Sequence, residues 1–142
     1  MSLLRKLAAW FDHRSEPVHI RHGKVGELAA RKYLEQNGLK FLTANFKTQR
    51  GELDLVFRDQ DCLVFVEVKA RVDESRGRPA AAVDRRKRRR LSRAAMDYLR
   101  ALKDPCVRIR FDVVEVLLDG DRVREVRHLP NTFSLSTPYR HG

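Results

Sequence analysis

The chain of 142 residues has few of the residues that build secreted or membrane-spanning proteins. Its two cysteines, Cys62 and Cys106, lie far apart and form no C-x-x-C pair, so two buried free thiols in a reducing cytoplasm are the simpler interpretation. No apolar run exceeds five residues, which excludes an ordinary transmembrane helix. The early segment LAAWF is too short for a signal-peptide core. We therefore expect a cytoplasmic protein without a membrane partner.

Acidic residues are also scarce relative to basic ones. The sequence has 19 Asp and Glu against 30 Lys and Arg, which gives a formal net charge of +11. A surface with this charge attracts polyanions, so nucleic acid is the first expected partner and an anionic membrane surface the second. The chain also lacks the glycine patterns of P-loop and Rossmann proteins, which argues against a dedicated nucleotide fold.

The length suits one domain with a substantial core. We expect residues 1–22 to form an extension with a short amphipathic helix at 3–11 and a loop from about residue 12 to 23. Residues 23–128 should form a single domain. The tail at 129–142 should be irregular.

Apolar spacing and turn signals predict an α/β domain with a mixed sheet flanked by helices, in the order αβββαβ. Short polar turns join the first three strands, which suggests an antiparallel meander. An Asp-Gly pair near residue 120 predicts a final hairpin, whose second strand would lie at the sheet edge. The expected helices are 24–37 and 82–102, and the expected strands are 40–47, 52–58, 62–71, 106–120 and 121–129.

The stretch CLVFVEVKAR, residues 62–71, carries two charges at the end of a strand that otherwise reads as buried. Alternate side chains of a strand share a face, so Glu67 and Lys69 continue the face that begins with Leu63 and Phe65. Charges are rarely placed in a core unless they are paired, bound to metal or used in chemistry. A structural ion pair is the simplest alternative to a functional site here.

The preceding strand also carries carboxylates. Strand alternation predicts that Glu52, Asp54 and Val56 share one face, and that the apolar residues 53, 55 and 57 share the other. If this strand pairs with the next through its short turn, Asp54 can converge with Glu67. Two close carboxylates repel, and Mg²⁺ with its preference for oxygen ligands would relieve that repulsion. With Lys69 nearby, the set suits metal-assisted phosphodiester hydrolysis.

Asp54 followed by Glu67-Val68-Lys69 resembles the signature of the PD-(D/E)XK nuclease superfamily. The wider pattern resembles the YraN family of small bacterial proteins, and the resemblance covers residues 23–118. Leu53 stands where the superfamily has the proline of its PD pair. The segments that carry the resemblance are GELAARKYLEQNG, NFKTQRGELDLVF, VFVEVKAR and AVDRRKRRRLSRAAMDYL.

This resemblance implies a restriction-endonuclease-like core close in style to Holliday-junction resolvases, with Mg²⁺ or Mn²⁺ as cofactor. It implies that Asp54, Glu67 and the Val68 carbonyl bind the metal. Glu27 would hold a metal-bound water, and apolar residues three and seven positions later place it on the packed side of its helix. Lys69 would orient the nucleophile and stabilise the developing charge. A homodimer is implied by analogy with resolvases.

A basic run near the start of the second helix is the other strong feature, with seven basic residues in nine. A solvated helix face is the usual explanation, but consecutive like charges repel along a helix and are relieved by phosphate. Lys87 falls within the apolar stripe, so we expect it to point toward the sheet, where it could reach the site or pair with a buried acid such as Asp112. Asp112 could alternatively neighbour the site. The expected nucleic-acid-binding residues are Arg85, Arg86, Lys87, Arg88, Arg89, Arg90 and Arg93.

The sequence thus leads to a metal-dependent endonuclease that hydrolyses phosphodiester bonds of structured or branched DNA. The alternative is a nucleic-acid-binding protein, for DNA or RNA, that keeps a nuclease fold with little or no turnover. The acid, acid, lysine set favours the enzyme, because a pure binding module has no physical need to keep those charges in a core strand. Nothing in the sequence reads bases or 2′-hydroxyls in a recognisable way, so DNA is favoured over RNA only by the resemblance.

Overall fold

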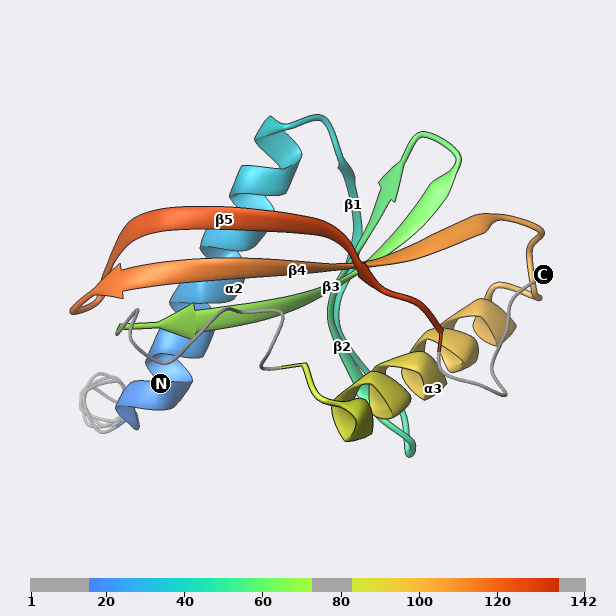
Figure 1. The fold of residues 1–142 in the computed structure, drawn as a ribbon, viewed down its shortest axis with the longest axis horizontal. Coiled ribbons are helices and arrows are strands. Elements are labelled where there is room, and N and C mark those ends of the chain that lie inside the picture. The colour runs from blue at the N-terminus through green and yellow to red at the C-terminus, as the bar shows by residue number, and fades with distance from the viewer. Residues whose placement is uncertain (1–15, 73–82, 136–142) are drawn as a thin grey trace, which may run out of the picture.

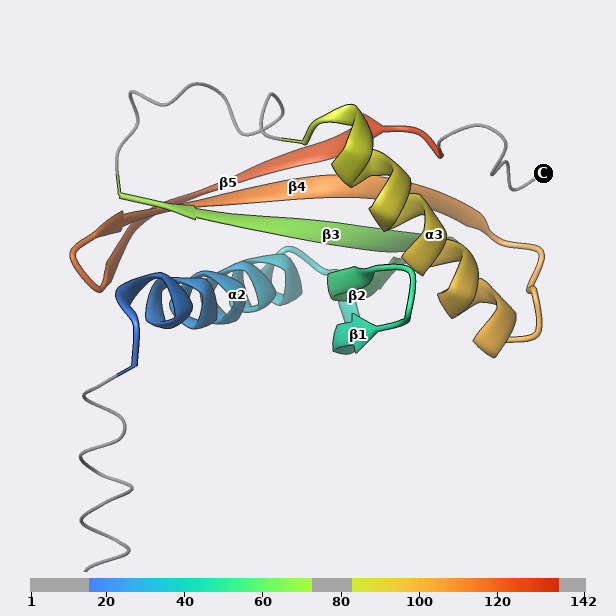
Figure 2. The ribbon, with the colours of Figure 1, turned by 90° about the horizontal axis from the view of Figure 1, so that it is seen from below.

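The computed structural model describes residues 16–72 and 83–135, which form a mixed α/β fold with a helix on each face of a five-stranded sheet (Figures 1 and 2). The strands lie in the order β1-β2-β3-β4-β5; β3 and β4 are parallel, and the other neighbours are antiparallel. The predicted order of helix, three strands, helix and two strands is confirmed. The elements are α2 (Val18–Gln36), β1 (Lys40–Lys47), β2 (Glu52–Asp59), β3 (Cys62–Arg71), α3 (Arg85–Ala101), β4 (Arg108–Asp119) and β5 (Arg122–Phe133).

Helix α3 covers one face of the sheet through an aromatic core. Phe65 of β3 lies 5.8 Å from the Tyr98 ring and 5.5 Å from the Phe111 ring, measured between centroids. Leu91 and Leu99 of α3 are buried in the same cluster. The Asp84 side chain caps the helix by accepting a hydrogen bond from the Lys87 amide at 2.8 Å. This cap fixes the first turn of α3, which carries the basic run.

Helix α2 covers the opposite face. Its buried residues Gly26, Ala30 and Leu34 recur every four positions, which is the spacing of one helical stripe. Ala30 and Leu34 pack in one cluster with Val64 of β3. The next residue of that strand, Phe65, points the other way into the α3 core. A Cβ atom at Gly26 would lie 2.9 Å from the Ala70 Cβ, so the glycine lets α2 approach β3 closely. No helix in residues 16–72 or 83–135 is long and apolar enough to cross a membrane.

Strand β2 bends where it passes from one core to the other. Leu53 packs in the α3 core whereas Leu55 packs in the α2 core, so the prediction that both share one face is wrong. The bend lies at Asp54 and at Asn45, which faces it on β1 and has a φ of +53°. Asn is among the few residues that adopt this left-handed conformation readily. Figure 1 shows β1 and β2 running steeply across the direction of β3–β5.

Two predicted boundaries are corrected. Helix α2 begins at Val18, inside the segment expected to be a loop, because Pro17 is tolerated at a helix start and its carbonyl accepts the first helical hydrogen bonds. Strand β5 continues to Phe133 rather than ending in an irregular tail at residue 129, because Phe133 stacks on Phe111 at 4.6 Å in the α3 core. The helix expected at 3–11 and the tail beyond residue 135 lie outside the described residues. The prediction that both cysteines are buried is wrong, since Cys62 is half-buried and Cys106 is exposed.

Candidate acid and lysine site

The candidate site lies in a cleft of about 520 Å³ between the β1–β2 turn and the first turns of α3. Asp54 and Glu67 contribute to its lining from the sheet, and Lys87 and Arg90 contribute from the helix. The turn can approach α3 because residue 51 is glycine: a Cβ there would lie 2.5 Å from the Arg90 carbonyl oxygen. The cleft therefore depends on close backbone packing.

The turn is also held by side chains. Thr48 accepts a hydrogen bond from the Gly51 amide at 3.1 Å, which closes the turn. Arg50 forms an ion pair with Asp97 of α3, with Nη2 and Oδ1 2.5 Å apart. The guanidinium of Arg50 holds the pKa of Asp97 below its usual range. The turn is thereby fixed to the helix that carries the basic run.

Asp54 lies at the bend of β2, where pairing with β3 stops. The last paired residues are Leu55 and Val66, so the Val68 amide beyond them turns to a side chain for its partner. It donates to Asp54 Oδ2 at 2.9 Å. Burial raises the pKa of Asp54 to about 8, and the charge of the neighbouring Glu67 contributes to the rise. Asp54 is therefore a carboxyl group that a cation would readily convert to its charged form.

Glu67 is the most enclosed acid of the cleft, with 6% of its surface exposed. Its Oε1 lies 3.4 Å from Lys69 Nζ and also forms an ion pair with Lys87 Nζ. Asp54 completes this group, since the charge of Glu67 raises the pKa of Asp54. One carboxylate oxygen thus faces two ammonium groups that come from different elements, β3 and α3.

The pKa values of the two lysines shift in opposite directions. Burial lowers the pKa of Lys69, and the nearby Lys87 lowers it further. Burial acts in the same direction on Lys87, but its hydrogen bond to Glu67 prevails and raises the pKa of Lys87. Lys87 is therefore the firmer counter-ion of Glu67, and Lys69 is the ammonium group that is more readily deprotonated.

Glu27 reaches the same region from α2. It is half-buried, and Asn45 Nδ2 donates a hydrogen bond to its Oε2 at 3.2 Å. Burial raises the pKa of Glu27, Asn45 opposes this, and the charges of Glu52 and Glu67 add to the rise. The charges of the acid cluster therefore act on Glu27, although Glu27 lies on α2, which covers the opposite face of the sheet from α3.

The donor set fits a cation that needs few protein ligands. Within residues 16–72 and 83–135, no three His, Cys, Asp or Glu side chains form a ready-made metal cage. Mg²⁺ is commonly bound by one or two carboxylates, with waters and substrate phosphates completing its shell. Asp54 and Glu67 supply two such carboxylates, and the pKa of Asp54, raised first by burial and then by the charge of Glu67, would be lowered by a cation. The Val68 carbonyl stays a predicted third ligand.

The basic run forms the outer side of α3 above this cleft. Lys87 is half-buried and inward, as its place in the apolar stripe predicted. Arg88 is exposed like its neighbours, but its Nε donates a hydrogen bond to the Val83 carbonyl at 3.0 Å. Arg93 is half-buried. The exposed members of the run are Arg85, Arg86, Arg88, Arg89 and Arg90.

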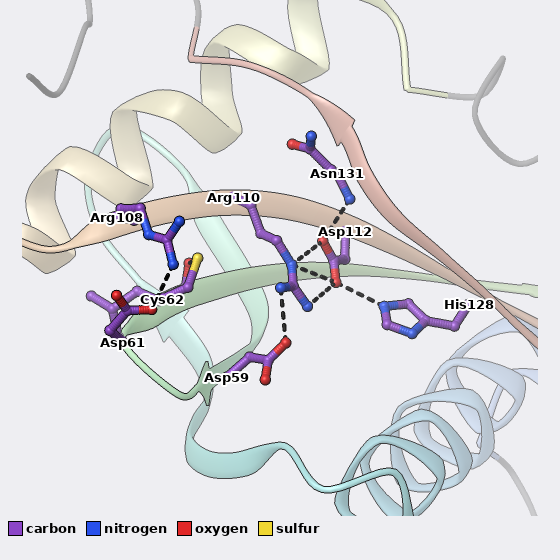
Figure 3. Close-up of polar contacts among 9 residues, drawn as sticks. Asp59, Asp61, Cys62, Arg108, Arg110, Asp112, His128 and Asn131 are labelled. Atoms are coloured by element: carbon purple, nitrogen blue, oxygen red, sulfur yellow. Dashed lines mark hydrogen bonds and ion pairs between the residues drawn. The ribbon is translucent and has the colours of Figure 1, made fainter.

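Asp112 lies on the other face of the sheet, away from the cleft and from Lys87; it does pair with a basic residue, but that residue is Arg110. Its carboxylate accepts hydrogen bonds from Arg110 Nε at 3.1 Å and from the Asn131 amide at 2.9 Å (Figure 3). His128 Nε2 lies 2.7 Å from Asp112 Oδ2. Burial alone would raise the pKa of Asp112, but its hydrogen bonds with His128 and Arg110 outweigh that effect, so the pKa is lowered. Asp112 is thus an anchor between β4 and β5.

The sequence patterns predict no role for two residues that lie beside predicted site residues, Asn45 and Glu115. Asn45 falls within an ordinary strand pattern, although an Asn inside such a pattern can signal a left-handed kink. Glu115 has no predicted role, yet it is 2% exposed and lies beside Lys69 in the β3–β4 register. Its oxygens lie 3.8 Å from Arg71 Nε and 3.6 Å from Arg127 Nη1. Strand alternation combined with the parallel register could have found this ionic row.

The fold and cleft define a class: a mixed α/β protein with a buried acid and lysine cluster beneath a basic helix. The chain belongs to the uncharacterised protein family UPF0102, whose family model matches residues 26–116. A UPF0102 protein of Pelotomaculum thermopropionicum is 43% identical over 112 residues, covering 78% of this chain and 93% of the relative. One from Ectopseudomonas mendocina is 46% identical over 106 residues, covering 72% and 87%. One from Chlorobaculum parvum is 41% identical over 116 residues, covering 78% and 90%.

Proposed function

We propose that this protein is a divalent-metal-dependent endonuclease that cuts structured or branched DNA. The observation that carries the proposal is the convergence of Asp54 and Glu67 in one cleft from separate strands, with Lys69 Nζ 3.4 Å from Glu67 Oε1. The order of helices and strands, with β3 and β4 parallel, is compatible with the restriction-endonuclease-like core implied by the sequence resemblance. Perturbed acids and lysines in a cleft are a recognised mark of functional sites.

The surroundings of the cleft favour a nucleic acid substrate. Exposed arginines of α3 lie above the acids, and Arg90 itself lines the cleft. With a net charge of +11, the protein attracts polyanions at long range. Guanidinium groups bind phosphates without reading bases, so these residues supply affinity and position rather than sequence specificity.

Each side chain then has a distinct part. Bound Mg²⁺ or Mn²⁺ supplies Lewis-acid stabilisation of the phosphate charge and a more acidic water. Asp54 and Glu67 would hold that cation, and Glu27, fixed by its hydrogen bond from Asn45, would orient a water. Lys69, whose pKa is lowered by burial, orients the nucleophile and stabilises charge on the phosphate. The narrow turn at Gly51 keeps the reacting groups close to α3.

A second candidate is a nucleic-acid-binding protein that keeps this fold with little or no turnover. The observation in its favour is the neutralisation of Glu67 by two lysines, which satisfies the carboxylate without any metal. In this case the arginines of α3 would bind the nucleic acid, and the acid and lysine cluster would stabilise the junction between the sheet and α3. RNA would then be as acceptable a ligand as DNA.

Cleavage of labelled duplex, flap, four-way-junction and single-stranded DNA, with matched RNA, separates the two candidates. Reactions contain Mg²⁺, Mn²⁺ or EDTA and compare the wild type with Lys69→Ala and Asp54→Asn. We expect metal-dependent cutting of branched DNA and at least about a hundredfold loss in each variant, which is typical for removal of one electrostatic or acid-base group. Asp61→Asn, an exposed Asp-to-Asn change, is the control. Tight binding with no cutting under any metal would establish the second candidate.

A further inference from the structure

The side chain of Lys87 differs from the rest of the basic run in where it points. The arginines on either side of it are exposed, whereas Lys87 turns inward to form an ion pair with Glu67. Its backbone is fixed at the first turn of α3 by the Asp84 cap. A residue of the helix that faces the nucleic acid therefore contacts the acid that would hold the cation.

This arrangement links the two binding events through one side chain. A cation at Glu67 replaces the positive charge that Lys87 supplies, because two neighbouring cations on one carboxylate repel each other. The side chain of Lys87 is 33% exposed, at the mouth of a cleft that Arg90 also lines. A displaced lysine at this place can reach a phosphate that Arg90 contacts, since its stem is long and flexible.

We propose that Lys87 couples cation binding to nucleic-acid binding, by neutralising Glu67 in the cation-free protein and contacting a phosphate once a divalent cation has taken that place. The proposal rests on the proposed function for the identity of both ligands. It assigns Lys87 as a positioning residue rather than another member of the backbone-binding run. Coupling of this kind is reciprocal, so the cation tightens nucleic acid and nucleic acid tightens the cation.

The test measures binding, with no cleavage needed. Fluorescence anisotropy of a labelled four-way junction is recorded with EDTA and with Ca²⁺, at matched ionic strength, for the wild type, Lys87→Gln and Arg86→Gln. Arg86→Gln removes one charge from the same turn but from an exposed position. We expect Ca²⁺ to tighten wild-type binding at least about fivefold, the lower end of ordinary coupling. That ratio should fall below about twofold in Lys87→Gln and persist in Arg86→Gln, which binds more weakly in both conditions.

A second readout uses the cation alone. Mn²⁺ titrations followed by electron paramagnetic resonance, without nucleic acid, should show tighter binding to Lys87→Gln than to the wild type, because no ammonium competes at Glu67. An unchanged calcium ratio in Lys87→Gln, or unchanged or weaker Mn²⁺ binding, overturns the coupling and leaves the proposed nuclease intact. Failure of the wild type to bind any divalent cation overturns both. Circular dichroism confirms that each variant is folded.

Discussion

Two buried carboxylate centres lie on opposite faces of the same sheet, and they are compensated in different ways. Asp112, on the α2 face, is fully enclosed and accepts hydrogen bonds from a guanidinium group and a backbone amide, with an imidazole 2.7 Å away. Asp54, on the α3 side, has the Val68 amide as its donor and a second carboxylate as its neighbour. The pKa is lowered at Asp112 and raised to about 8 at Asp54.

The difference separates a structural use of buried charge from a functional one. Arg110 joins Asp112 to Asp59 of β2, where Nη1 and Oδ2 lie 2.9 Å apart, so the network ties three strands together. A carboxylate whose donors are all present gains nothing from a new ligand. Asp54 lacks that balance, since burial and the charge of Glu67 both raise its pKa, and a divalent cation would compensate its charge. Under-compensated charge in a cleft is therefore the more informative feature of this molecule.

The largest expected effect comes from making the same substitution in both centres. Asp112→Asn removes the charge that Arg110 and His128 face, and loss of one partner of a buried ion pair costs about 3–5 kcal/mol of unfolding free energy. Asp54→Asn replaces a carboxyl group that its pKa of about 8 keeps largely neutral at pH 7, so it should change stability by less than about 1 kcal/mol in metal-free buffer. Urea unfolding of both variants measures the contrast.

Asp61→Asn serves as the control for this pair, because Asp61 forms a surface ion pair with Arg108 that is open to solvent. Its unfolding curve should match that of the wild type. Equal destabilisation by Asp54→Asn and Asp112→Asn would mean that both centres are structural, and the contrast between them would fail.

A smaller effect is expected where the cleft depends on close backbone packing. Gly51→Ala places a Cβ 2.5 Å from the Arg90 carbonyl, so the turn or α3 must shift, at a cost of about 1–3 kcal/mol typical of overpacking. Gly23→Ala is the matched control: a Cβ there meets nothing within 4 Å, and alanine favours the helix. Thermal unfolding should move in opposite directions for the two variants, and a neutral Gly51→Ala would contradict the close packing.

The pH dependence of stability should differ between the two centres. The pKa of Asp54 rises from 3.8 to about 8 on folding, so the folded protein holds this proton more tightly than the unfolded chain does. Metal-free stability therefore falls as pH rises from about 4 toward 8, and Asp54→Asn should remove about 2–3 kcal/mol of that fall between pH 5 and 7.

Asp112 has the opposite sign, since its pKa is lowered on folding. Its contribution is present above pH 3.8, the ordinary pKa of the group, and is lost as the pH falls through the lower folded value. Urea unfolding at a series of pH values in EDTA tests both statements. Parallel pH profiles for the wild type and Asp54→Asn would mean that Asp54 has no raised pKa.

The sequence predicted the element order and much of the candidate cleft because those features follow from local patterns. Strand alternation placed Glu67 and Lys69 on the face of Phe65, and the apolar stripe of α3 turned Lys87 inward. It failed at Asp54, where a bend of β2 breaks the alternation. It failed at Asp112 because strand register, which decides the partners of a buried acid, is a tertiary property.

The smallest expected effect is on the salt dependence of nucleic-acid binding, when positive charge is removed from α3. Replacing Arg85, Arg86 and Arg89 by Gln should lower the slope of log affinity against log salt concentration, by about 0.9 for each phosphate of duplex DNA that the protein ceases to neutralise. The control replaces exposed arginines outside α3, on β2, β4 and β5, which removes the same charge: Arg58, Arg108 and Arg122. Fluorescence anisotropy across a salt series measures both slopes. Equal slopes for the two triple variants would mean that net charge alone attracts nucleic acid. A lower slope only for the α3 variant would place the phosphates beside the cleft, on the side of the sheet where the acids are under-compensated.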